Sequence, residues 1–143
     1  MREILFRGYD SVGGKGWVYG DLVHNQKVTV DGLEPRVMVG GYEVGAESVG
    51  QFTGLLDRNN RRIFEGDIIE CVSWNEFFSV NGKPLERMRR RLLVAFRHGA
   101  FVCIERQQAP FDDKVWDMIT SHDCVVVGNV KENPELFEKK RAF

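Results

Sequence analysis

The sequence predicts a mainly β fold, a small barrel-like sheet or sandwich of short antiparallel strands with one or two short helices, one of them at the C-terminus. Three observations point to it. The 143 residues include 15 glycines, which separate short apolar runs and so indicate closely spaced turns. Several runs alternate apolar and polar residues, the period of a half-buried strand. A complete helix start occurs only near the end of the chain, at 132–140.

Length and composition fit one globular domain over residues 1–143. A chain of this size buries enough surface to fold without metals or disulfides. The hydrophobic fraction of 43% and the charged fraction of 29% argue against disorder. A subdivision is also conceivable, with an N-terminal β segment at 1–48 and a barrel-like core with the C-terminal helix at 49–143. The 20 cations balance 21 acids, giving a net charge of −1, so a nucleic-acid partner would need a local patch.

The first 45 residues read as short strands separated by glycine turns. "EILFR" at 3–7 alternates like a strand, and "DSVGGKG" at 10–16 supplies a flexible connection. Extended structure resumes with "WVYGDLV" at 17–23, and "KVTVDG" at 27–32 ends in Asp31-Gly32, a favoured hairpin turn. "RVMVGGYEVG" at 36–45 is a further strand broken by paired glycines.

The stretch from 51 to 72 contains two tight turns. "QFTGLLD" and "RRIFEG" flank Arg58-Asn59-Asn60, where asparagine tolerates the left-handed conformation of a tight hairpin. Glu65-Gly66-Asp67 forms the second turn and leads into the strand "IIECV". Asp57 and Asn59 begin like a calcium loop, but Arg61 and Arg62 follow where ligands and glycine would stand. We therefore expect Asp57 to cap the turn.

The hairpin "RLLVAF-RHGA-FVCIE" at 91–105 is the clearest in the chain. His98-Gly99 forms its two-residue loop, because histidine is among the residues enriched at positive φ. This loop pairs Phe96 with Phe101, and further along it pairs Val94 with Cys103 and Leu93 with Ile104.

The last third of the chain combines one buried strand with helical segments. "APFDDKVWDMITSHD" at 109–123 is compatible with one helical turn or an irregular segment, and "CVVVGNV" at 124–130 is a buried strand. "ENPELFEKK" begins a helix, with Asn133 as the N-cap, Pro134 in the first helical position and Glu135 in the first turn.

The cysteines and the N-terminus indicate the cytoplasm. Cys71, Cys103 and Cys124 are odd in number, have apolar neighbours and lack C-x-x-C spacing. They are expected to be buried free thiols in a reducing compartment. "MREILFRG" lacks the apolar region of a secretory signal, and the apolar runs are too short to cross a bilayer.

No residue constellation indicates catalysis, a metal or a cofactor. "SHDC" at 121–124 places Ser121, His122, Asp123 and Cys124 in a row, but neighbours on an extended chain point to opposite faces. The three histidines have no metal-ligand spacing, and neither glycine-rich phosphate motif occurs. The sequence therefore predicts a protein that is not an enzyme, with no catalytic residues, no metal and no cofactor.

Residues 74–91, "WNEFFSVNGKPLERMRRR", are the candidate interaction surface. Asn-Gly-Lys-Pro is strong loop chemistry, and the arginines after it lack an apolar stripe, which predicts a long hairpin excursion. Together with Arg61 and Arg62, it is compatible with a modest nucleic-acid patch or with a solvated, charged sheet edge. The candidate residues are Trp74, Phe77, Phe78, Arg87, Arg89, Arg90 and Arg91.

The central run "VGQFTGLLDRNNRRIFEGDIIE" at 49–70 closely resembles the hallmark of the YopX family, small proteins of bacterial prophages and phages. "EILFRG", "WVYGDL", "RRLLVAFRHGAFVC" and "VVVGNVKENPELFEK" extend the resemblance over nearly the whole chain. It implies a mainly β fold with small barrel-like, SH3-like sheets and a phage-derived protein in a bacterial cytoplasm. The family has no established activity, so the resemblance transfers no catalytic or ligand residues.

These observations favour a non-enzymatic binding or assembly module encoded by a prophage. Its partner would be another protein or a second copy, contacted through residues 74–91. The alternative is an accessory nucleic-acid-binding protein that uses the Arg87–Arg91 region. A membrane partner is not expected.

Overall fold

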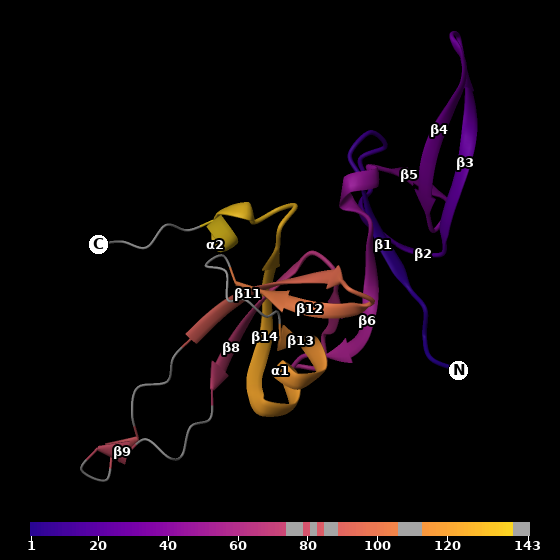
Figure 1. Ribbon diagram of the computed structural model, residues 1–143. Helices are drawn as coiled ribbons and strands as arrows, with labels where there is room; N and C mark the ends of the chain where they lie inside the picture. The colour runs from indigo at the N-terminus through magenta and orange to yellow at the C-terminus, as the bar shows by residue number, and fades with distance from the viewer. Residues whose placement is uncertain (74–78, 81–82, 85–88, 106–112, 139–143) are drawn as a thin grey trace. The chain divides into compact units, whose positions relative to one another are not determined.

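The computed structural model describes residues 1–73, 79–80, 83–84, 89–105 and 113–138 (Figure 1). Antiparallel strands dominate, and within the described residues the two α-helices are short, one of them near the C-terminus. The expected mainly β fold class is therefore confirmed. The chain divides into two compact units, Met1–Gly54 and Leu55–Phe143, and the boundary falls inside strand β6.

The first unit contains two small sheets. One has β1 (Phe6–Asp10) between β2 (Gly16–Gly20) and β6 (Gly50–Leu56). Strand β6 runs across the boundary, and the next strand in its sheet, β7 (Arg62–Phe64), belongs to the second unit. The other has the order β3-β4-β5, with β3 (Leu22–Thr29), β4 (Gly32–Val39) and β5 (Tyr42–Val44). A 3₁₀ turn, η1 (Ala46–Ser48), leads from β5 to β6.

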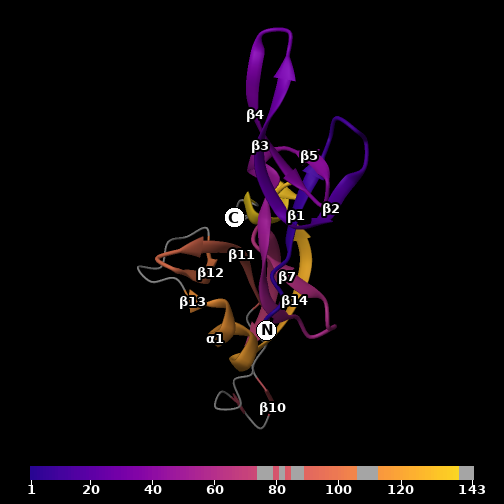
Figure 2. The same cartoon turned by 90° about the vertical axis from the view of Figure 1, so that its right-hand side faces the viewer.

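Valines from both sheets make the core of this unit. Val18, Val39 and Val44 are buried together, which removes their apolar surface from water and stabilises the contact between the sheets. Partly buried apolar residues surround them: Phe6, Leu22, Val37 and Val49. The β3–β4 hairpin extends well beyond this core (Figure 2).

The second unit is built on a five-stranded antiparallel sheet of order β13-β12-β11-β8-β14. Its strands are β8 (Asp67–Ser73), β11 (Arg89–Arg97), β12 (Ala100–Ile104), β13 (Asp113–Lys114) and β14 (His122–Asn129). A separate short pair joins β9 (Ser79–Val80) to β10 (Lys83–Pro84). Helices α1 (Val115–Ser121) and α2 (Pro134–Glu138) precede and follow β14.

The core of the second unit combines sheet and helix residues. Its largest fully buried side chains include Ile63, Ile69 and Leu92, and Met118 of α1 packs into the same cluster. Val115, the first residue of α1, is also fully buried. The helical alternative for residues 109–123 is thus confirmed for Val115–Ser121, where α1 covers this core with its apolar residues.

The turns predicted at Asn60, Gly66 and His98-Gly99 and the β11–β12 register are confirmed. Asn60, His98 and Gly66 have φ of 62°, 53° and 88°. Phe96 pairs with Phe101, as do Val94 with Cys103 and Leu93 with Ile104. The rings of Phe96 and Phe101 form an edge-to-face contact with centroids 5.1 Å apart, a preferred geometry for aromatic pairs.

The local expectations differ in outcome. The hairpin turn expected at Asp31-Gly32 consists of Val30 and Asp31, since Thr29 pairs with Gly32. "WVYGDLV" is extended as expected and divides into two strands, because Gly20 has φ of 149° and the chain leaves the first sheet there. Helix α2 begins at Pro134 as expected, but the Asn133 carboxamide accepts the backbone N–H of Asn129, 3.2 Å away.

The expectation of three free thiols was wrong for two of them. Cys71 and Cys124 are directly opposite on β8 and β14 and form a disulfide. Spacing along the sequence does not reveal such a pair, because strand register brings together residues 53 positions apart. Cys103 is the buried free cysteine.

Candidate binding site on the β3–β4 hairpin

The β3–β4 hairpin has one apolar face. Because directly opposite residues in an antiparallel pair share a face, the β3–β4 register defines this face. It comprises Leu22 opposite Val39, His24 opposite Val37, Gln26 opposite Pro35, and Val28 opposite Leu33. We call these eight residues the apolar hairpin face.

Only the base of the apolar hairpin face is covered by the core of the first unit. Val39 is fully buried and Leu22 and Val37 are partly buried. Toward the turn, Val28 is 84% exposed and Leu33 is 64% exposed. The alternation of apolar residues, which usually indicates a buried face, therefore extends to residues that are exposed to solvent.

The opposite face of the hairpin carries the apolar pair Val23 and Met38 at its base and polar side chains toward the turn. The Arg36 Nε donates to Asn25 Oδ1 over 2.6 Å, and Lys27 Nζ forms an ion pair with Glu43 of β5 at 2.8 Å. These partners fix long side chains across the three strands. The outer halves of the two faces thus differ in chemistry.

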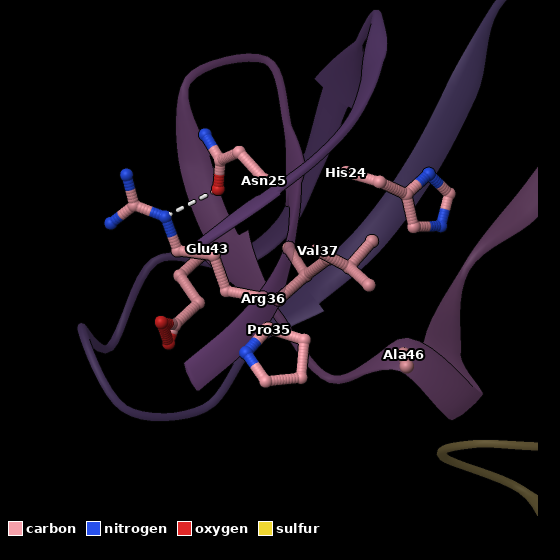
Figure 3. Close-up of a pocket in the computed structure, with 8 residues that line it drawn as sticks. His24, Asn25, Pro35, Arg36, Val37, Glu43 and Ala46 are labelled. Atoms are coloured by element: carbon pink, nitrogen blue, oxygen red, sulfur yellow. Dashed lines mark hydrogen bonds between the residues drawn. The ribbon is translucent and has the colours of Figure 1, made fainter. Parts of the chain in front are cut away.

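A pocket of about 350 Å³ lies at the hairpin's base. Its lining residues are His24, Asn25, Pro35, Arg36, Val37, Glu43, Val44 and Ala46. Figure 3 shows His24 beside Val37, with Asn25 and Arg36 joined by their hydrogen bond away from the imidazole. Apolar walls with a few polar groups are typical of binding sites. The pocket is continuous with the apolar hairpin face, because it shares His24, Pro35 and Val37 with it.

Of the arginines predicted as an interaction surface, Arg89, Arg90 and Arg91 lie on β11 beside carboxylates. Arg89 and Arg91 both contact Glu70, at 3.3 and 3.4 Å. Arg90 contacts Glu105, and its Nη2 lies 3.4 Å from Asp113. Trp74, Phe77, Phe78 and Arg87 lie outside the described residues.

Glu105 and Asp113 stabilise the protonated form of the Arg90 guanidinium. Burial lowers the pKa of Arg90, but hydrogen bonds and Coulombic attraction from these two carboxylates outweigh burial, so the pKa lies above its ordinary value. The guanidinium is thus engaged within the sheet.

The "SHDC" residues do not form a triad. Ser121 Oγ lies 2.6 Å from His122 Nδ1, but Asp123 contacts Arg58 at 3.8 Å and Cys124 is in the disulfide. Asp57 caps its turn as predicted, accepting the N–H groups of Asn59 and Arg61. No group of three or more His, Cys, Asp or Glu residues suited to a metal ion occurs in the part of the chain that the structure describes. Among the described residues, no helix has the length and apolar character needed to cross a bilayer.

Comparison with known proteins identifies the family. The model of the YopX protein family matches residues 6–138, nearly the whole chain. The chain belongs to the YopX family. Among solved structures, protein EF1440 from Enterococcus faecalis matches with a TM-score of 0.53 and 20% sequence identity. The match covers 96% of this YopX chain and 99% of that one, so the shared feature is the fold. No curated protein matches.

Sequence reasoning found the strands of the hairpin but not its exposed face. The signal was present in the alternation of Leu33, Pro35, Val37 and Val39. Alternation identifies a face that is apolar. It does not tell where along a strand the covering core ends, and this decides which residues are available to a partner.

Proposed function

We propose that this YopX protein is a non-enzymatic binding or assembly module, encoded by a prophage and acting in the bacterial cytoplasm. The family resemblance supports this location, whereas the thiols do not, because Cys71 and Cys124 form a disulfide and disulfides are rare in reducing compartments. The observation that carries the proposal is the exposed outer half of the apolar hairpin face. Val28 and Leu33 are a directly opposite pair in solvent, and Val30 is fully exposed at the adjacent turn. A partner surface that covers them would remove a contiguous apolar strip from water.

Burial of the exposed side chains of this face would contribute substantially to the free energy of binding. Fully burying one Val or Leu side chain contributes about 1.5–3 kcal/mol. Because Val28 is 84% and Leu33 is 64% exposed, covering the pair supplies roughly 2–4 kcal/mol before the costs of association are subtracted. The Arg36 guanidinium and His24 imidazole beside the pocket add hydrogen-bonding groups that favour one orientation of the bound segment.

A double variant, Val28→Ser with Leu33→Ser, tests the proposal. Immobilised wild-type protein should retain a specific protein from nuclease-treated host lysate or form a larger particle in light scattering, and the double variant should lose both. The control is Val12→Ser with Val127→Ser, which also removes two exposed apolar side chains but leaves the hairpin intact. Equal retention and equal particle size for all three proteins would contradict the proposal, provided that their melting temperatures agree.

The second candidate is an accessory nucleic-acid-binding protein that uses the Arg87–Arg91 region. It ranks lower because Glu70, Glu105 and Asp113 lie against Arg89, Arg90 and Arg91 and compete with phosphate. Titration with single-stranded and duplex DNA at several salt concentrations tests it. A binding constant that falls steeply with salt would favour this candidate, because phosphate contacts release counterions.

A further inference from the structure

We propose that two copies of this YopX chain pair through strand β3, antiparallel and around a two-fold axis at Asn25, so that their β3-β4-β5 sheets become one. The inference deepens the binding-module proposal and rests on it, because it names the partner as a second copy. It is carried by the position of β3, by its register with β4 and by the charges of the hairpin.

Strand β3 is an edge. Among the residues that the structure describes, only one side of β3 has a neighbour in the sheet, whose order is β3-β4-β5. Natural edge strands are usually blunted by charges, proline, bulges or short length. β3 has eight residues, pairs with β4 without a register shift, and has Lys27 as its one charged residue apart from the titratable His24.

The register determines which backbone groups face outward. In a hairpin with a two-residue turn, the pair flanking the turn faces inward, and inward and outward residues then alternate. Thr29 and Gly32 flank this turn. The outward-facing backbone groups of β3 are therefore those of Leu22, His24, Gln26 and Val28.

A two-fold axis at Asn25 places the outward backbone groups of one copy opposite the outward backbone groups of the second copy. It places His24 opposite Gln26 of the second copy and Leu22 opposite Val28. The two apolar hairpin faces then join on one side of the combined sheet, because opposite residues in antiparallel strands share a face. Lys27 lies opposite Val23 of the second copy, so the two ammonium groups do not meet.

The charges of the hairpin also suit a second copy. Between Leu22 and Val39, Lys27 and Arg36 balance Asp31 and Glu34. A neutral hairpin does not repel its own copy, whereas it offers little long-range attraction to a strongly charged partner.

Disulfide trapping tests the axis. Residues facing each other in a non-hydrogen-bonded antiparallel pair have Cα atoms about 4.5 Å apart, within disulfide range. Asn25→Cys should therefore form a covalent dimer under mild oxidation, seen on a non-reducing gel. Lys27→Cys is the matched control, since its two copies would be offset by about 13 Å along the strands. An equimolar mixture of Val23→Cys and Lys27→Cys should cross-link, whereas wild type should not.

A proline variant tests the edge itself. Gln26→Pro removes an outward N–H while leaving the bonds to β4 in place, since edge strands tolerate proline. Light scattering should show a dimer for wild type and for Gln26→Ser, and a monomer for Gln26→Pro with an unchanged melting temperature. A wild-type monomer at several hundred micromolar overturns the pairing, and so does a dimer that Gln26→Pro leaves intact. Cross-linking at Gln26→Cys instead of Asn25→Cys overturns the axis.

The outcomes separate the two proposals. A wild-type monomer that still retains a lysate protein through Val28 and Leu33 keeps the binding module and rejects the self-pairing. A dimer trapped at Asn25 without any lysate partner supports an assembly made only of this chain. Failure of both experiments removes both proposals.

Discussion

Loss of the Asp57 side chain should destabilise the second unit. The residue is 6% exposed, and its carboxylate joins two segments distant in sequence. Oδ1 accepts the N–H groups of Asn59 and Arg61 at 2.8 and 2.9 Å, and Oδ2 accepts the N–H of Val126 at 2.9 Å. Val126 lies 69 positions after Asp57 in the sequence, so one side chain forms hydrogen bonds with both the turn and strand β14.

Asp57→Asn keeps the size of the side chain but not its three acceptor sites. In either orientation of the amide, its NH₂ group faces a backbone N–H, so a donor meets a donor. A hydrogen bond to a charged group contributes about 1.5–3 kcal/mol, and an unpaired buried N–H costs about 1–3 kcal/mol. These two figures count part of the same effect, and the turn can shift so that water reaches the freed N–H groups. We therefore expect a loss of about 2–4 kcal/mol in the free energy of unfolding.

Urea denaturation followed by circular dichroism measures this loss, and the exchange rate of the Val126 amide reports the same bond locally. Exchange should accelerate in Asp57→Asn. The control is Asp117→Asn, since Asp117 is exposed on α1, and its midpoint should stay near that of wild type. An Asp57→Asn midpoint equal to wild type, with Val126 still protected, would refute the reasoning.

Three further predictions concern glycines and thiols. Gly66→Val should lower the free energy of unfolding by about 1–3 kcal/mol, since φ is 88° at this position; an unchanged urea midpoint would contradict this. Gly40→Ala should lower the melting temperature of the first unit, because its Cβ would lie 2.3 Å from the Tyr19 carbonyl oxygen, whereas Gly14→Ala, with open space around it, should cost less. Burial, and then the charge of Asp113, raise the pKa of Cys103 to about 12, so it should react slowly with a thiol reagent at pH 8. The protonated Cys103 thiol contributes to the free energy of unfolding fully below the ordinary pKa of 9.0, and this contribution is lost as the pH rises from there to about 12. In guanidinium, a thiol reagent should titrate one cysteine before reduction and three after it.

Local sequence determined the turns of this YopX protein and the register that follows from them. His98-Gly99 and Asn60 adopt positive φ, and the two-residue loop at His98 sets the pairing of Phe96 with Phe101. Such features depend on residues within a few positions of one another. The sequence is also sufficient to predict that α2 begins at Pro134.

Long-range pairing was decided only by the tertiary structure. Cys71 meets Cys124, and Asp57 reaches Val126, because β8, β14 and the turn after β6 come together in one unit. The contacts that join distant segments depend on the order of strands in a sheet, and no short pattern encodes that order. The exposed half of the apolar hairpin face follows the same rule. Its alternation is written in the sequence, but whether Val28 and Leu33 meet a core or solvent depends on how far the neighbouring strands extend.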